Sequence, residues 1–165
     1  MNHIAYIGVG SNLGDPVENC LRAMETMDGS ADIRVTARSS LYKTEPVGFT
    51  DQEWFVNAAV EVRTALDPQD LLQTLQKIEK QMGRVAGKKW GPRIIDLDIL
   101  FFDDLILESQ ALHLPHPHAG ERRFVLVPLS EIARGLIHPG LNKTVFELLA
   151  QLPEGQAVQQ KPLAG

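Results

Sequence analysis

Two carboxylates and one guanidinium, close together in the sequence, are the residues best suited to chemistry. Asp96 and Asp98 interrupt an apolar stretch over 94–102, and Arg93 follows a Gly-Pro turn just before it. The β-branched and apolar residues predict a strand, so both carboxylates should lie on one face, with Cα atoms about 6.6 Å apart. Paired carboxylates suit a divalent cation and a guanidinium suits phosphate, so the pattern indicates phosphoryl transfer.

A structural interpretation of the same residues is available. A D-x-D pair also occurs on strands that face solvent, where Arg93 would be a surface ion-pair partner. Short motifs often match by chance, and the spacing alone favours this structural interpretation. The surrounding elements and the other polar residues must therefore decide between the two.

The order of elements around the motif predicts an α+β fold. Apolar patterns predict strands over 3–9, 33–42, 55–64 and 94–102, and helical spacing predicts helices over 16–27 and 68–82. Asp15 and Asp67 each precede a proline and are expected to cap these helices. The order βαββαβ is typical of a ferredoxin-like core with an antiparallel sheet.

The C-terminal third should add to this core. Leu105-Ile106-Leu107 predicts an extra hairpin strand, and two helices are expected, one from 122 to 132 and one ending at Leu152 with Asn142 or Thr144 as its cap. We expect residues 1–153 to form a single domain. The polar stretch 154–165 should be a frayed tail.

Composition limits the possible partners. The net charge of −5 over 165 residues argues against a nucleic-acid-binding protein, whose domain should be basic. Cys20 is the only cysteine, which excludes an intramolecular disulfide and fits a reduced, cytoplasmic compartment. No apolar run approaches membrane length, and the first residues lack a signal-peptide pattern. We expect a monomer without membrane or nucleic-acid partners.

Several polar and glycine positions allow more than one interpretation. Gly8 and Gly10 begin a possible dinucleotide-binding motif, but Leu13 occupies its third glycine position, so a structural turn over 8–15 is favoured. Asn57 within a strand is either exposed or a directional hydrogen-bonding group in a pocket. Gln76 and Glu79 are expected close together on the surface of the second helix. The histidines at 113–118 match no standard zinc site.

Six stretches together form a recognisable pattern, and Trp-Gly-Pro-Arg-Ile-Ile-Asp-Leu-Asp at 90–98 is the most specific string in it. The stretches are 8–15, 44–48, 55–59, 83–100, 115–117 and 121–129. They resemble the 6-hydroxymethyl-7,8-dihydropterin pyrophosphokinase family, and the resemblance runs from about residue 4 to residue 149. One departure is Lys89, where the family usually has arginine, because lysine lacks the bidentate contact to phosphate.

The resemblance implies transfer of pyrophosphate from ATP to the hydroxymethyl group of 6-hydroxymethyl-7,8-dihydropterin, with release of AMP, in folate biosynthesis. It implies two Mg²⁺ ions held by Asp96 and Asp98, with Arg84 and Arg93 stabilising the transferring group. The implied ATP-binding residues are Gln76, Glu79, Lys88, Lys89, Ile99, Leu112, His116 and Arg122. The implied pterin-binding residues are Thr44, Val47, Phe55, Asn57, Trp90 and Phe124.

The loop over 83–92 carries glycines at both ends and in the middle, so we expect it to close when both substrates are bound. Two other functions are open from the residues alone. One is a metal-dependent nucleotidyltransferase or nuclease that uses the same D-x-D pair. The other is a non-catalytic nucleotide-sensing module, since RNA-binding and sensor domains share this order of elements.

Overall fold

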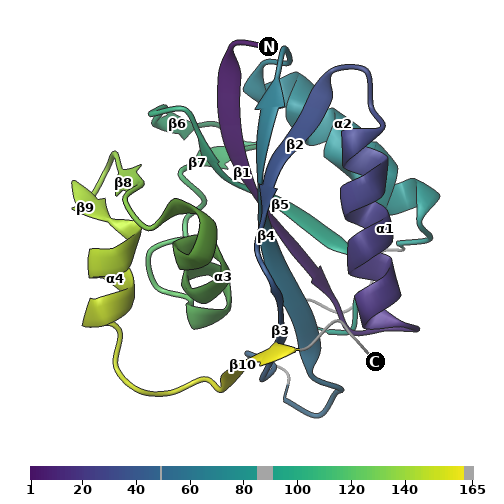
Figure 1. Ribbon diagram of the computed structural model, residues 1–165, viewed down its shortest axis with the longest axis vertical. Coiled ribbons are helices and arrows are strands. Elements are labelled where there is room, and N and C mark those ends of the chain that lie inside the picture. The colour runs from purple at the N-terminus through teal and green to yellow at the C-terminus, as the bar shows by residue number, and fades with distance from the viewer. Residues whose placement is uncertain (49, 85–90, 162–165) are drawn as a thin grey trace.

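The computed structural model describes residues 1–48, 50–84 and 91–161 (Figure 1). Its main sheet contains β1 (His3–Ser11), β2 (Ile33–Arg38), β3 (Leu41–Thr44), β4 (Phe55–Thr64), β5 (Asp96–Phe102) and β10 (Val158–Lys161). The helices are α1 (Pro16–Asp28), α2 (Pro68–Gln81), α3 (Arg123–Ala133) and α4 (Val145–Gln151). Two short hairpins join β6 (Leu107–Glu108) to β7 (His113–Leu114) and β8 (Ile137–His138) to β9 (Lys143–Thr144).

The sheet has the order β10-β3-β4-β1-β5, with β2 also paired to β4, and every pairing within it is antiparallel. The first and last strands of the βαββαβ order, β1 and β5, therefore lie next to each other. This arrangement confirms the predicted ferredoxin-like α+β core with added C-terminal elements.

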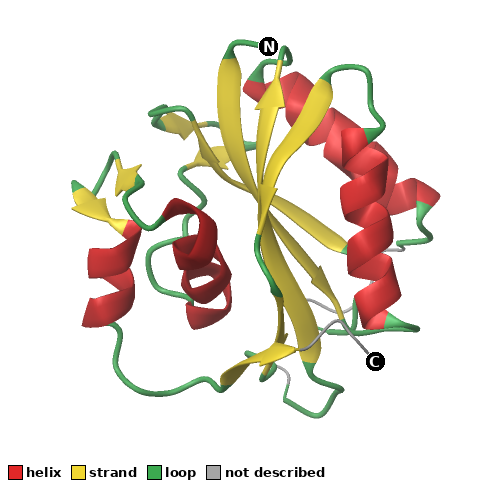
Figure 2. Ribbon diagram, in the orientation of Figure 1, coloured by secondary structure: helices red, strands yellow, loops and turns green. Residues whose placement is uncertain are grey.

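Helices cover both faces of the sheet, α1 and α2 on one side and α3 and α4 on the other (Figure 2). Val56, Ala58, Val60 and Val62 of β4 pack into the core under α1 and α2, as their alternation predicts. The opposite face has its own core, which includes Tyr6, Ala59 and residues of α3 and α4. The sheet thus separates a closed helical layer from the layer that contains the cavity described below.

A bulge in β5 changes the alternation near its end. Tyr6 pairs with Phe101 and Ile7 pairs with Ile99, so Leu100 is an extra residue on the β5 side. Leu100 and Phe101 consequently both belong to the core beneath α3 and α4. The Leu100 carbonyl accepts a hydrogen bond from the His116 backbone N–H at 2.9 Å. The bulge therefore attaches the histidine-containing segment to the sheet.

The predicted helix caps are confirmed. Asp15 accepts from the Glu18 backbone N–H, and Asp67 accepts from that of Asp70. The last helix is capped by Thr144, which forms a reciprocal capping box with Glu147. None of the helices in the described ranges has the length and hydropathy needed to cross a bilayer.

Two strand boundaries differ from the prediction. The predicted strand over 33–42 divides into β2 and β3 at Ser39, whose hydroxyl accepts from the Ala59 backbone N–H at 2.9 Å and so interrupts the regular ladder. The turn predicted to start at Gly8 is also wrong, because β1 continues to Ser11. Glycine is a poor strand former, which is why the sequence indicated a turn there.

The predicted extra hairpin is present, but its bounds differ. Leu107–Glu108 pairs with His113–Leu114, so of residues 105–107 only Leu107 lies in a strand. The prediction for the tail is wrong in part. The tail is not frayed at Val158–Lys161, which pairs with β3 at the edge of the sheet. Gln159 and Gln160 of this strand have exposed side chains, but the backbone of the strand completes the hydrogen bonds of an otherwise open edge.

Candidate active site

A cavity of about 360 Å³ lies on the face of the sheet toward α3. Strands β1, β3, β4 and β5 contribute its floor, and the start of α3 and the segment before it form a wall. Its lining residues are Gly8, Val9, Gly10, Thr44, Glu45, Val47, Phe55, Asn57, Ala58, Gly91, Arg93, Asp96, Asp98, Leu100, His116, His118, Arg122, Phe124, Val125 and Gln156.

Strand register places the polar groups of this floor in one row. Tyr42 pairs with Asn57, Asn57 with Gly10, and Gly10 with Asp96, so four neighbouring strands contribute to it. In the adjacent row Gly8 pairs with Asp98. Both glycines line the cavity between Asn57 and the two carboxylates, where the absence of a side chain lets neighbouring groups approach the backbone closely.

The orientation of the Asn57 amide is fixed by its neighbours. Its Nδ2 donates to Thr44 Oγ1 at 2.6 Å, and both side chains are buried. A Cβ placed on Gly10 would lie 2.6 Å from Asn57 Oδ1, so this oxygen lies directly over the glycine. Asn57 therefore presents a hydrogen-bond acceptor to the cavity, and Gly10 leaves the room for it.

The carboxylates of β5 have an acidic neighbour beneath them. Glu79 of α2 is 5% exposed and accepts from the Leu97 backbone N–H at 2.8 Å, between the two aspartates. Burial, followed by the charges of Asp96 and Glu79, raises the pKa of Asp98 to about 7. Burial also raises the pKa of Glu79. These three carboxylates need nearby positive charge to remain ionised together.

Arg84 supplies part of this charge. It follows Gly83, whose φ of +97° ends α2 in a Schellman motif: the Gly83 N–H donates to the Lys80 carbonyl and the Arg84 N–H to that of Glu79. The guanidinium is thereby directed to two acids, 3.2 Å from Glu79 Oε1 and 3.6 Å from Asp96 Oδ1. Its Nε is buried and has no hydrogen-bond partner among the described residues.

Arg93 is positioned through its backbone. Its N–H donates to Asn12 Oδ1 at 2.8 Å, and its carbonyl accepts from the Asn12 N–H at 2.9 Å. The Asn12 amide also donates to Gln52 Oε1 and to the Glu53 carbonyl. Asn12 therefore joins the segment that carries Arg93 to the loop before β4.

The segment before α3 contributes a neutral imidazole. Burial, helped by the charge of Arg122, lowers the pKa of His116 to about 4. Its Nδ1 accepts from the His118 backbone N–H at 3.2 Å, so the neutral ring carries its proton on Nε2. His118 in turn contacts Glu121 Oε1 at 2.5 Å. Arg122 lies over the Phe124 ring, with 5.4 Å between its Cζ and the ring centroid.

The structure brings most of the predicted site residues together. The predicted residues that line the cavity are Thr44, Val47, Phe55, Asn57, Arg93, Asp96, Asp98, His116, Arg122 and Phe124. Arg84 and Glu79 do not line the cavity within the described residues, but they contact Asp96 or its strand. The expectation that Glu79 lies on the surface is wrong, because the packing of α2 on β5 buries it.

Three further predicted residues lie away from the cavity. Gln76 is exposed on α2, and Ile99 and Leu112 are buried in the core under α1 and α2. Lys88, Lys89 and Trp90 lie outside the described residues, as does most of the loop that we expect to close.

Several lining residues are not predicted from the sequence. Gly8 and Gly10 line the cavity within β1, where the sequence predicts a turn; the available signal is that a G-x-G inside a strand indicates close approach of another group. Glu45, His118 and Gln156 also line the cavity. No local pattern indicates Gln156, because its place depends on the path of the chain after α4.

A family profile and the curated relatives of this chain carry the same enzyme name. A sequence profile described as 7,8-dihydro-6-hydroxymethylpterin-pyrophosphokinase matches residues 6–134. The chain is 47% identical over 152 residues to the 2-amino-4-hydroxy-6-hydroxymethyldihydropteridine pyrophosphokinase of Methylorubrum extorquens, covering 92% of this chain and 95% of that protein. It is 47% identical over 134 residues to the protein of that name in Bacillus subtilis, covering 81% and 80%.

Solved structures agree on the fold. The Plasmodium falciparum HPPK-DHPS protein, solved with pteroate, superimposes with a TM-score of 0.73 over 90% of this chain and 42% of its own. The identity is 18%, so this similarity supports the architecture alone.

Proposed function

Since the chain belongs to the 7,8-dihydro-6-hydroxymethylpterin-pyrophosphokinase family, we propose that the cavity over β1, β4 and β5 is its active site. The protein is an enzyme of folate biosynthesis that transfers pyrophosphate from ATP to 6-hydroxymethyl-7,8-dihydropterin. The assignment of each substrate to a part of the cavity is our proposal, and it follows from the chemistry of the lining side chains.

The end of the cavity near β3 suits the pterin. Phe55 and Phe124 offer aromatic faces to a flat heterocycle, and Asn57 offers the oriented acceptor described above. Thr44 fixes the amide and Val47 adds an apolar contact. In this proposal Asn57 accepts from an N–H group on the edge of the pterin, which selects a ring with a donor there. Trp90, outside the described residues, stays a predicted pterin contact.

The end near β5 suits the triphosphate. Asp96 and Asp98 provide hard carboxylate oxygens on one face, and no third Asp, Glu, His or Cys side chain of the described residues is placed to hold a metal ion with them. This donor set fits Mg²⁺, which is commonly held by one or two carboxylates while phosphates and water complete its shell. Bound there, Mg²⁺ would neutralise charge on the phosphates. The presence of two ions remains part of the proposal.

Three cationic side chains surround the same end. Arg93 and Arg122 line it, and Arg84 contacts Asp96. In our proposal Arg84 exchanges its carboxylate contacts for phosphate oxygens, and its unpartnered Nε provides a further donor. His116 donates from Nε2 to a phosphate or ribose oxygen.

The remaining nucleotide contacts stay predictions. They concern Gln76, Glu79, Lys88, Lys89, Ile99 and Leu112. Ile99 and Leu112 have core-facing side chains, so any contact with ATP would use their backbone.

In this proposal the site promotes pyrophosphate transfer mainly by aligning the hydroxymethyl group of the pterin with the β-phosphate of ATP. The hydroxymethyl oxygen attacks the β-phosphorus, and the bond from that phosphorus to the oxygen of the α-phosphate breaks, so AMP leaves. Transition states of this type are loose, and positioning with charge neutralisation accounts for most of their catalysis. The pairing of three strands is the observation that supports this proposal most. Asn57 of β4 and Asp96 of β5 lie on opposite sides of Gly10 of β1. A pterin bound at Asn57 can therefore direct its hydroxymethyl group toward phosphates held at Asp96.

Product analysis tests the reaction. With ATP, the pterin and Mg²⁺, we expect AMP and pterin diphosphate in equal amounts by anion-exchange chromatography, with no AMP in the absence of the pterin. ADP as the stoichiometric product would instead indicate transfer of one phosphate.

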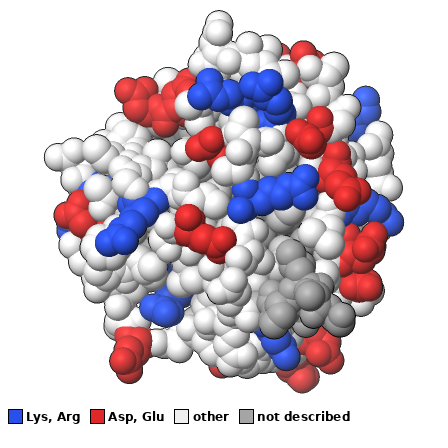
Figure 3. Space-filling model, in the orientation of Figure 1, with Lys and Arg blue, Asp and Glu red and all other residues white. Residues whose placement is uncertain are grey.

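The charge pattern in Figure 3 bears on the nuclease alternative. On the face shown there, lysines and arginines are interspersed with acidic side chains, and the described residues visible on it form no continuous basic track of the kind that binds a nucleic acid. The monomeric state and the cytoplasmic location stay predictions.

A further inference from the structure

The C-terminal segment approaches the cavity from outside the region that the family profile matches. The profile ends at residue 134, whereas Gln156 lines the cavity. After α4 the chain crosses from the α3–α4 layer to the outer edge of the sheet, where β10 pairs with β3 (Figure 1). The register pairs Val158 with Thr44, so this strand adjoins a residue of the proposed pterin pocket.

Gln156 connects two walls of the cavity. Its Nε2 donates to the Glu45 carbonyl, and the Glu45 N–H donates to the Ala157 carbonyl at 3.0 Å. Its own carbonyl accepts from Arg123 Nε at 3.2 Å, at the first residue of α3. One wall holds Thr44 and Val47 next to Glu45, and the other holds Phe124 next to Arg123.

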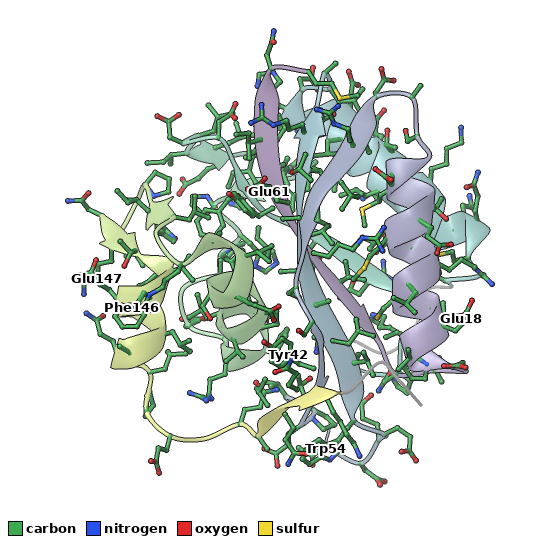
Figure 4. The ribbon with its side chains drawn as sticks, viewed as in Figure 1. Glu18, Tyr42, Trp54, Glu61, Phe146 and Glu147 are labelled. Atoms are coloured by element: carbon green, nitrogen blue, oxygen red, sulfur yellow. The ribbon has the colours of Figure 1, made fainter. Side chains whose placement is uncertain are left out.

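A second anchor holds the same strand farther from the cavity. Gln160 Nε2 donates to Ser40 Oγ at 2.9 Å, and the Ser40 hydroxyl donates to Glu131 Oε2 of α3. Tyr42 also donates from its hydroxyl to Glu131 at 2.6 Å, and its side chain points from β3 toward α3 (Figure 4). The spacing between β3 and α3 is therefore set at two points, and only the one at Gln156 reaches the cavity.

We propose that the segment 156–160 is a strap that fixes the width of the pterin end of the cavity, with Gln156 as its positioning residue. The proposal rests on the assignment of that end to the pterin. A flat ring held between two walls is sensitive to their separation, whereas the triphosphate binds at β5, on the other side of β1. The strap should therefore govern pterin affinity and leave nucleotide affinity unchanged.

Single substitutions along the strap give the first test. Gln156→Ala removes the bond to Glu45 and should raise the KM for the pterin about three- to tenfold, the equivalent of one neutral hydrogen bond. The KM for ATP, kcat and the melting temperature should stay near those of the unaltered protein. Arg123→Ala, which releases the α3 side of the strap, should act in the same direction. Gln159→Ala is the matched control, because this exposed side chain lies on the same strand and forms no hydrogen bond with the described residues.

Removal of residues 156–165 gives the second test. The KM for the pterin should rise more than tenfold, because the backbone bonds of β10 are lost as well. Direct calorimetric titration with the pterin should show the same loss of affinity, while titration with Mg²⁺ and a non-hydrolysable ATP analogue should be unchanged. If the truncation weakens the binding of the pterin and of the ATP analogue equally, or changes neither, the proposal that this segment is a strap is wrong.

One further variant separates this proposal from the site assignment. Asn57→Ala should raise the KM for the pterin through the loss of a direct contact. If Asn57→Ala weakens pterin binding and the strap variants do not, the strap alone is wrong. If Asn57→Ala also has no effect, the pterin binds elsewhere and both proposals fail.

Discussion

Asn12 and Arg93 hold each other through two hydrogen bonds, from the Arg93 N–H to Asn12 Oδ1 at 2.8 Å and from the Asn12 N–H to the Arg93 carbonyl at 2.9 Å. Eighty-one residues separate them in the chain. Asn12 is 4% exposed and its amide also binds the loop at Gln52 and Glu53. One buried amide therefore sets the position of a proposed catalytic arginine relative to that loop.

We expect Asn12→Ala to lower stability by about 1–3 kcal/mol, because it leaves the Arg93 N–H without this acceptor and the Glu53 carbonyl without this donor. Its kcat should fall more than tenfold as Arg93 loses its alignment. Thermal melts and steady-state kinetics measure the two effects. Asn2→Ala, at an exposed position, is the control. Normal kcat in Asn12→Ala would mean that Arg93 is positioned by other contacts.

The two aspartates should be required for turnover but not for folding. Asp96→Asn and Asp98→Asn each keep the shape of the side chain and remove a metal ligand, so activity should fall by roughly three orders of magnitude or more. Each also removes a negative charge from a group of three acids, so in EDTA the variants should melt no lower than the unaltered protein. Asp104→Asn, an exposed carboxylate beyond β5, is the control. Activity close to normal in either variant would contradict the proposed metal site.

A methyl group at Gly10 should block the pterin end. The added Cβ would meet Asn57 Oδ1 at 2.6 Å and would displace an amide that Thr44 holds in place. We expect Gly10→Ala to weaken pterin binding by roughly tenfold or more, from an overpacking cost of about 1–3 kcal/mol. The Cβ of Gly8→Ala would lie 3.4 Å from Leu100 and should have a smaller effect. Calorimetry on both variants measures this order, and Gly135→Ala, with nothing within 4 Å, is the control.

His116 should make stability fall in mild acid. Its folded pKa is about 4, below the value near 6.5 in the unfolded chain, so the unfolded state binds more protons between these pH values. Stability is therefore lost as pH falls from 6.5 to 4, by about 2 kcal/mol, which is less than the full shift because the ring is partly exposed.

Comparison of variants isolates this contribution. Asp98 has a raised pKa and acts in the opposite direction, so the difference between the unaltered protein and His116→Gln is the informative quantity. Denaturant titrations at pH 7 and pH 4.5 measure it, and His113→Gln, an exposed histidine, is the control. An equal loss of stability in His116→Gln would contradict the assignment.

The sequence predicts features that depend on local spacing. The helix caps at Asp15 and Asp67 follow from the residue type that precedes each helix. The two-residue alternation of a strand places Asp96 and Asp98 on one face, and it directs Asn57 away from the side of its two neighbours. Features that depend on register or on distant segments could not be predicted. The placement of Gly10 between Asn57 and Asp96 requires the pairing of three strands.

Two further residues show the same limit. Glu79 has the polar side chain of a surface residue, and only the packing of α2 on β5 explains its burial and its bond to Leu97. Val158–Lys161 has no apolar alternation, because an edge strand is held mainly by backbone hydrogen bonds to its neighbour.

At the bulge, β5 has one residue, Leu100, that pairs with no residue of β1. This extra residue determines where insertions and deletions can be tolerated in the family. Loss of Leu100 would leave a regular strand in which Asp98 and Phe101 keep their present faces. The cost would be the carbonyl that binds His116. We therefore expect homologues that have lost this residue to differ at 115–118 as well. An insertion between Asp96 and Asp98 would place the two carboxylates on opposite faces of the sheet, so natural insertions should instead fall in the exposed turn at 103–106.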